Sequence, residues 1–255
     1  MSDQASKAQS FHALHVRGTP LVIFNVWDPG SAKAVAEAGA KALATGSWSV
    51  AAANGFADGE RIPLDLAIGN LARIVAAASL PVSVDIESGY GKTPEEVGRS
   101  IARTLEAGAI GCNLEDSYPE DGALRPVAEQ VERIRHARKA ADVARIPYFI
   151  NARTDVFFET PADKHDAALL EAALERARAY ADAGASGLFA PGLVDPALIA
   201  RLAAACSLPL NIMASSRTPR LRILAEAGVA RISHGPGPYI TAMKAVAEGA
   251  KAAFG

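Results

Sequence analysis

A short motif occurs four times along the chain: an acidic residue, then Ala-Gly, then Ala or Val. The copies begin at Glu37, Glu106, Asp182 and Glu226, and each precedes an apolar stretch. A glycine just beyond an alanine-rich helix is the usual left-handed stop of that helix, so the apolar stretch is expected to be the next strand. The repeat therefore predicts a chain in which helices and strands alternate regularly.

Four further apolar runs complete this pattern. Three of them follow a proline, at Pro81, Pro147 and Pro209, and the fourth spans residues 21–26. Proline is tolerated at the first residue of a strand because no ladder N–H is lost there, so it marks the start of each run. Strands separated by helices indicate parallel βαβ units, and about eight such units close a (β/α)8 barrel of the TIM type.

The length of the chain agrees with one barrel. It has 255 residues, half of them apolar, and about 250 residues are typical of this fold. We expect a single (β/α)8 domain over residues 1–255 with a short helical extension at the N-terminus. A doubly wound open sheet is the alternative, which is disfavoured because no Gly-x-Gly-x-x-Gly follows the first strand and the repeat continues evenly to the end.

Charge and hydropathy exclude several kinds of partner. The formal net charge is −2, and the basic residues are scattered along helical stretches, so the electrostatic footprint of a nucleic-acid-binding protein is missing. Residues 1–10 are polar and no segment approaches about 18 uninterrupted apolar residues, which predicts neither a signal peptide nor a membrane span. We expect a cytoplasmic protein with no nucleic-acid or membrane partner. Cys112 and Cys206, in or beside apolar runs, are expected to be buried free thiols.

Polar residues end three of the apolar runs. Asp85 and Glu87 end the third expected strand, Glu115 lies at the same depth on the fourth, and Arg153 ends the fifth. In a parallel barrel the carboxyl ends of the strands meet on one rim, which carries the active site. Carboxylates so close together repel one another unless a cation neutralises them, and an all-oxygen set suits Mg²⁺ or Mn²⁺. The alternative is that Asp85 and Glu87 cap the next helix or pair with arginines of the rim.

Four segments, in order, resemble the isocitrate lyase/phosphoenolpyruvate mutase family, and the resemblance runs over most of the chain. They are residues 24–32 (FNVWDPGSA), 84–91 (VDIESGYG), 113–116 (NLED) and 151–155 (NARTD). The resemblance implies an α/β barrel that uses Mg²⁺ to bind a 2-oxo or 2-hydroxy carboxylate and that breaks or forms the bond next to the enolate carbon. It also implies a homo-oligomer, a dimer or tetramer, whose subunits exchange their C-terminal helices.

The same resemblance implies roles for the acidic residues. Asp85 would contact the metal most directly, whereas Glu87 and Glu115 would act largely through metal-bound water. Asp58 matches a catalytic acidic residue on the loop after the second strand. On local grounds, Asp58 could equally be a solvated turn residue. Glu87 stands where many family members have aspartate, so its carboxylate reaches one methylene further.

Substrate-binding roles follow in the same way. The segment Thr45, Gly46, Ser47 and Trp48 falls where the family holds the substrate carboxylate with backbone N–H groups and a hydroxyl. Arg153 would bind the carboxylate or the developing enolate oxygen, for which a permanently charged fork is suited. The alternative for Arg153 is a structural ion pair with Asp155. Further candidates for substrate contact end the seventh strand: Asn211, Met213 and Ser215.

The loop at residues 117–126 departs from the family. Isocitrate and methylisocitrate lyases carry a Lys-(Lys/Arg)-Cys-Gly-His segment here, whose cysteine is the general acid, but this loop has no Cys, His or Lys. Isocitrate lyase activity is therefore not expected, and the lysine-containing lid of carbon–phosphorus enzymes is missing too. We expect residues 117–126 to form a mobile lid. We also expect residues 234–238, which contain two prolines, to close the barrel rather than cradle a phosphate.

These observations predict a Mg²⁺-dependent carbon–carbon lyase or decarboxylase that acts on a small 2-oxo or 2-hydroxy carboxylic acid through an enolate. A phosphonopyruvate-type mutase or hydrolase is the alternative among enzymes. From a different class, a barrel that binds 2-oxo acids without turnover remains open, because the loop at residues 117–126 offers no evident proton donor.

Overall fold

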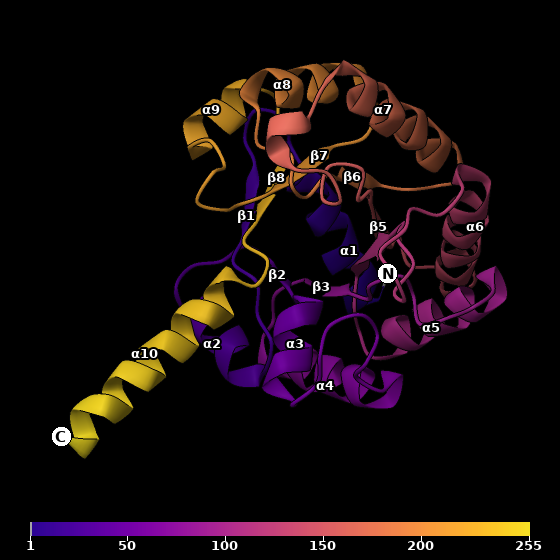
Figure 1. The fold of residues 1–255 in the computed structure, drawn as a ribbon. Helices are drawn as coiled ribbons and strands as arrows, with labels where there is room; N and C mark the ends of the chain where they lie inside the picture. Colours follow the sequence, from indigo (N-terminus) through magenta and orange to yellow (C-terminus); the bar gives the residue numbers. More distant parts are fainter. Residues whose placement is uncertain (1) are drawn as a thin grey trace.

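The computed structural model describes residues 2–255 and shows eight parallel strands arranged as a barrel with helices outside it (Figure 1). The strands are β1 Leu21–Ile23, β2 Leu43–Ala44, β3 Val82–Asp85, β4 Gly111–Glu115, β5 Phe149–Arg153, β6 Gly187–Phe189, β7 Leu210–Met213 and β8 Arg231–Ser233. Their order in the sheet is β1-β8-β7-β6-β5-β4-β3-β2. The ring closes between β1 and β2 through a parallel bridge from Val26 to Thr45. The predicted (β/α)8 barrel is confirmed, and the doubly wound alternative is wrong.

Four of the helices end at the acidic residue of the repeated motif, as predicted. The helices are α1 Asp3–Ala13, α2 Pro29–Glu37, α3 Ser47–Ala53, α4 Leu64–Ala77, α5 Pro94–Glu106, α6 Val127–Ala144, the 3₁₀ turn η1 Ala162–Lys164, α7 Ala167–Asp182, α8 Pro196–Ala205, α9 Leu221–Glu226 and α10 Gly237–Phe254. The four motif glycines, Gly39, Gly108, Gly184 and Gly228, all have φ between 84° and 100°. A residue with a Cβ is strained there, which is why glycine ends these helices.

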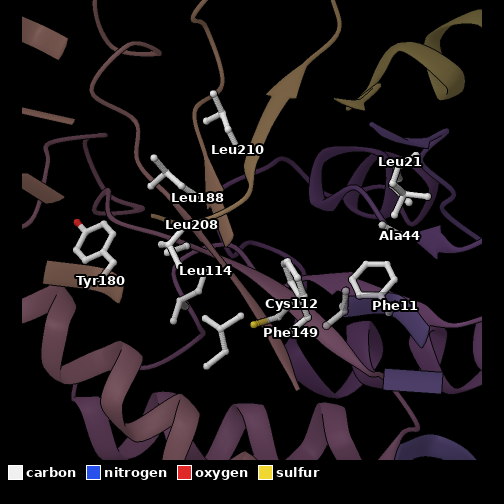
Figure 2. Close-up of a cluster of buried hydrophobic side chains, with 14 of the residues drawn as sticks. Phe11, Leu21, Ala44, Cys112, Leu114, Phe149, Tyr180, Leu188, Leu208 and Leu210 are labelled. Atoms are coloured by element: carbon white, nitrogen blue, oxygen red, sulfur yellow. The ribbon is translucent and has the colours of Figure 1, made fainter. Parts of the chain in front are cut away.

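Helix α1 closes the end of the barrel where the strands begin. Its Phe11 is fully buried, and the Phe11 ring packs edge-on against Phe149 at 5.3 Å between centroids. His15, just after the helix, stacks on the same Phe149 ring at 4.1 Å. Figure 2 shows Phe11 within the buried cluster that includes Phe149 and Cys112. The N-terminal helix is thus packed into the barrel, so that the other end alone is left for a site.

Helix α10 extends away from the barrel (Figure 1). Its apolar side chains are exposed, among them Ile240, Met243, Val246 and Phe254. A groove of about 720 Å³ lies along α1, β1 and α2, and its lining includes the exposed Val22 and Phe24. In a (β/α)8 barrel the last helix packs over this groove. Because α10 extends away from the barrel instead, the outer face of β1 is left uncovered.

Two smaller expectations concern cysteine and the membrane. Cys112 and Cys206 are buried free thiols, as predicted, and burial raises the pKa of the Cys112 thiol to about 12. Within residues 2–255, no helix combines the length and the apolar character that crossing a membrane requires.

Candidate active site

Asp85 lies at the carboxyl end of β3 and is held by the segment after β2. Its Oδ2 accepts hydrogen bonds from the backbone N–H of Ser47 at 3.2 Å and from the Ser47 hydroxyl at 3.1 Å. Its own N–H donates to Thr45 Oγ1 at 2.9 Å. Gly46 N–H donates to the carbonyl of Val26. The predicted carboxylate-binding segment therefore lies directly beside Asp85, where its donors now orient Asp85 and close the barrel.

Glu87 lies beyond the end of β3, because its φ of 51° turns the backbone out of the sheet. Its buried carboxylate accepts backbone N–H groups of Gly59 at 2.8 Å and Glu60 at 2.6 Å, and the Tyr90 hydroxyl at 3.1 Å. Burial, and then the charge of Asp58, raise the pKa of Glu87 to about 7. Glu87 thus joins the loops after β2 and β3.

Glu115 and Arg153 form an ion pair across the ends of β4 and β5. Arg153 Nη1 lies 2.8 Å from Glu115 Oε2, while Nε and Nη2 donate to the two oxygens of Asp155 at 2.6 and 3.1 Å. Burial raises the pKa of the Glu115 carboxyl, and Arg153 opposes that shift. Burial also acts to lower the pKa of Arg153, but Glu115 and Asp155 outweigh it and raise the pKa. Arg153 is therefore a fixed cation on the rim.

The structural pair of Arg153 with Asp155 is thus present. A guanidinium has five N–H donors, and the contacts with Glu115 and Asp155 use three of them. The Arg153 side chain retains 16 % exposure. Its free donors leave the substrate role open as a prediction.

The remaining predicted residues take different positions. Asp58 is exposed by surface area, yet its pKa is raised, first by lost hydration and then by the charge of Asp85, which places it near that carboxylate. Trp48 is exposed and its ring lies 5.9 Å from that of Tyr239 on α10. Asn211 is buried inside the barrel, where it accepts a hydrogen bond from Asn151 at 3.0 Å. Asp58 therefore joins the acidic rim, whereas Asn211 lies in the interior.

Two residues that the sequence analysis did not single out hold the rim together. Asn25 Oδ1 accepts the N–H groups of His234 and Gly235, each at 2.9 Å, and Asn25 Nδ2 donates to the Thr45 carbonyl. The turn at residues 234–238 thus closes the barrel.

Asp116 is completely buried and accepts hydrogen bonds from the Asp155 N–H, from Arg176 and from the Tyr180 hydroxyl. In the sequence, its position directly after Glu115 in the NLED segment was the signal that could have identified Asp116 as part of the rim.

The predicted lid, residues 117–126, lies beside this rim. Arg125 stacks over the Tyr118 ring at 4.0 Å, and both side chains bond to Glu129 at the start of α6. A polar groove of about 500 Å³ separates the lid from the loop after β3, with Tyr90 and Lys92 on the opposite wall. The loop is folded on itself and borders this groove, and its mobility stays a prediction.

The rim carboxylates are the predicted ligands of a metal ion. Within residues 2–255, no three Asp, Glu, His or Cys side chains converge as ligands of one ion. Asp85 nevertheless has Oδ1 in only a long contact, 3.4 Å from Glu87 N–H. Mg²⁺ keeps several waters and is bound through one or two carboxylates. The weakly bonded Oδ1 of Asp85 is therefore compatible with Mg²⁺ or Mn²⁺, and the metal roles of Asp85, Glu87 and Glu115 stay predictions.

Comparison with known proteins supports the family expectation. The model of the phosphoenolpyruvate phosphomutase family matches residues 11–254. The chain is 31% identical to the 2-methylisocitrate lyase of Escherichia coli K12, covering 84% of this chain and 72% of the relative. It is 30% identical to an oxaloacetate decarboxylase of Ectopseudomonas mendocina, over 87% and 75% of the two chains. A solved structure from Burkholderia cenocepacia J2315, provisionally named a phosphonomutase, is 59% identical and superposes with a TM-score of 0.96 over 98% of this chain and 99% of that one. With its barrel and rim acids, the chain belongs to the isocitrate lyase/phosphoenolpyruvate mutase family.

Proposed function

We propose that this protein is a carbon–carbon lyase or decarboxylase that acts on a small 2-oxo or 2-hydroxy carboxylic acid. The observation that carries the proposal is that Asp85 and the Glu115–Arg153 pair end neighbouring strands of a barrel of this family, close enough for the charge of Asp85 to act on both members of the pair. A lyase and a decarboxylase among the relatives support the reaction class. The cytoplasmic location expected from the sequence is part of this proposal.

Asp85 would hold Mg²⁺ or Mn²⁺ directly, and Glu87 and Glu115 would hold its waters. A bound divalent ion supplies Lewis-acid stabilisation of negative charge on a substrate oxygen. Asp58, beside Asp85, would act as a catalytic acid or base on the same rim. The chain's own contribution is to fix these carboxylates: Ser47 orients Asp85, while Gly59 and Glu60 orient Glu87.

Arg153 would bind the substrate carboxylate or the enolate oxygen that develops as the bond breaks. Glu115 and Asp155 hold its guanidinium from two sides, so little side-chain freedom is lost when substrate arrives. Donors that are already in place stabilise a developing oxyanion without reorganisation. The segment from Thr45 to Trp48 would complete the carboxylate pocket, and the lid at residues 117–126 would exclude water.

The lid favours a reaction that needs no cysteine acid. Tyr118 carries the phenolic hydroxyl of the lid, which is the candidate to replace the cysteine as general acid. This hydroxyl already donates a hydrogen bond to Glu129 at 2.7 Å. We therefore favour decarboxylation or a retro-aldol cleavage other than that of isocitrate. A phosphonopyruvate-type mutase or hydrolase is the second candidate, favoured by the resemblance to the structure named a phosphonomutase.

We also propose that the protein is a homo-oligomer, a dimer or tetramer. Helix α10 projects its apolar side chains away from its own barrel, and a groove beside β1 presents a matching apolar surface. Exchange of α10 between two copies would cover both surfaces. Size-exclusion chromatography with light scattering would show a monomer if this proposal is wrong.

The function is tested by mixing purified protein with oxaloacetate, 2-methylisocitrate and phosphonopyruvate, each with Mg²⁺ and with EDTA. Pyruvate formed with CO₂ or a second acid, only with Mg²⁺, supports the proposal. Phosphate or phosphoenolpyruvate from phosphonopyruvate supports the second candidate. Thermal stabilisation by these acids without product would indicate a binding protein and contradict both. Asp85→Asn is the control, because it keeps the shape of the side chain but removes its charge.

A further inference from the structure

Arg231 is a buried charge that the candidate mechanism does not use. The side chain, on β8, is completely inaccessible to solvent. Within residues 2–255 its Nε, Nη1 and Nη2 atoms have no hydrogen-bond partner. A buried charge is costly unless it is paired or hydrogen-bonded, so an arginine in this position requires an explanation.

The side chain of Arg231 faces the inside of the barrel. Successive strand residues point to opposite faces, so Arg231 and Ser233 share one face. Ser233 accepts a hydrogen bond from Asn211, which is bonded to Asn151, and Asn151 donates to Asn113. Three buried asparagines on β4, β5 and β7 thus form a polar layer across the interior, and Arg231 extends that layer to β8.

His15 presents a matching acceptor from the plugged end. Its Nδ1 lies 2.8 Å from the carbonyl of Phe11. A carbonyl only accepts, so Nδ1 carries the proton and Nε2 is a lone-pair acceptor. That Nε2 is buried and has no partner among the described residues. Burial, and next the charge of Arg231, lower the pKa of His15 to about 3, so the ring stays neutral and close to Arg231.

Ser83 contributes a third buried group without a partner. It lies two residues before Asp85 on β3, on the same inward face, and its hydroxyl is unbonded within the described chain. Donors on Arg231, an acceptor on the nearby His15 and a hydroxyl on Ser83 are therefore all buried in the barrel without a partner among the described residues. Buried polar groups of this kind are commonly bridged by ordered water.

The charge of Arg231 acts on the rim. Burial lowers the pKa of Arg231 to about 10, and the one acidic group that opposes this shift is Asp85. Asp85 ends the same face of β3 that carries Ser83, and the Arg231 side chain enters the interior from β8, close enough for the charge of Asp85 to act on it. Asp85 is thus attracted by an interior cation that has no direct ion-pair partner among the described residues.

We propose that Arg231 is a positioning residue: an interior positive charge that is held through water by His15 and Ser83. Its charge partly offsets the negative charge of the rim carboxylates. It thereby sets the affinity of the rim for a divalent cation and for an anionic substrate. This inference rests on the proposed function, because it assumes that the rim binds both. Its consequence is a trade-off: the charge weakens binding of the metal and strengthens binding of the acid.

The test measures Mn²⁺ binding, and oxalate binding at saturating Mn²⁺, by calorimetry on the purified full-length protein. The variants are Arg231→Met and Arg231→Gln, which remove the charge, and Arg231→Lys, which keeps it. The charge-removing variants should bind Mn²⁺ about tenfold more tightly and oxalate about tenfold more weakly, the size expected for one unscreened charge inside a protein. Arg231→Lys should stay close to the wild type in both measurements.

Arg17→Met is the matched control, since the partners of Arg17 within residues 2–255 are the carbonyls of Ala203, Cys206 and Leu208, away from the rim. It should change the melting temperature and leave both affinities unchanged. A change in melting temperature alone in the Arg231 variants, or a loss of both affinities together, would overturn the inference. Failure of the wild type to bind Mn²⁺, with no difference from Asp85→Asn, would instead overturn the proposed function and the inference with it.

Discussion

Replacing Arg153 with lysine keeps a positive charge on the rim but removes the planar fork of N–H donors. In the structure that fork contacts Glu115 at 2.8 Å and Asp155 at 2.6 and 3.1 Å. A lysine ammonium carries three N–H donors, but all of them lie on one nitrogen, so it cannot span Glu115 and Asp155 with a fixed fork and still aim a donor at a substrate oxygen. The substitution therefore separates the catalytic role of Arg153 from its structural pair with Asp155.

If Arg153 binds the carboxylate or the enolate oxygen, the transition state should lose about 2–4 kcal/mol, the scale of one preorganised oxyanion donor. This corresponds to a fall in kcat/KM of roughly 30- to 1000-fold. Asp155→Asn, which leaves the guanidinium in place, should lower the melting temperature and cost far less turnover per folded molecule. The assay is kcat/KM beside the melting temperature for both variants. A lower melting temperature with wild-type kcat/KM in Arg153→Lys would remove Arg153 from the catalytic residues.

Three further predictions address the rest of the rim. Asp85→Ala should abolish the thermal stabilisation that oxalate gives with Mg²⁺ while the fold stays intact, and oxalate affinity that persists in EDTA would contradict the metal role. Burial raises the pKa of Glu87 from about 4.5 to about 7. Between these two pH values the folded state keeps a proton on Glu87 that the unfolded state has lost. The free energy of unfolding of the metal-free protein should therefore fall by about 3 kcal/mol as the pH rises from about 4.5 to about 7. Glu87→Gln should flatten this slope in urea unfolding at several pH values, and an unchanged slope would refute the assignment. Deleting the lid tip, Glu120 to Gly122, should lower turnover much more than the melting temperature. In the undeleted protein, equal cleavage by a glutamate-specific protease after the exposed Glu120, with and without oxalate, would argue against lid closure.

The repeat predicted the fold well because its signals are local. Gly39, Gly108, Gly184 and Gly228 end their helices with positive φ, and the prolines at the strand entrances mark runs that become β3, β5 and β7. The strands are nevertheless shorter than the apolar runs suggested. Glu87 leaves the sheet in a left-handed conformation, which no pattern of apolar residues reveals for a residue other than glycine.

The site was predicted less completely because part of it depends on contacts between distant segments. Asp85, Glu115 and Arg153 follow from strand ends, whereas the anchoring of Glu87 by the loop at residues 59–60 comes from tertiary packing. Asn25 reads as an ordinary polar residue, yet it joins β1, the segment after β2 and the end of β8. Arg231 lies in an apolar run that predicted a strand, and only its burial shows that a charge enters the interior.

A crystal structure of the protein with Mg²⁺ and oxalate tests the central claim most directly, since oxalate resembles the enolate of pyruvate. The account predicts the ion on the carboxylate of Asp85, water between the ion and both Glu87 and Glu115, and oxalate within hydrogen-bond distance of Arg153 and the Thr45–Trp48 segment. Oxalate bound away from this rim, or an ion that does not contact Asp85, would contradict it.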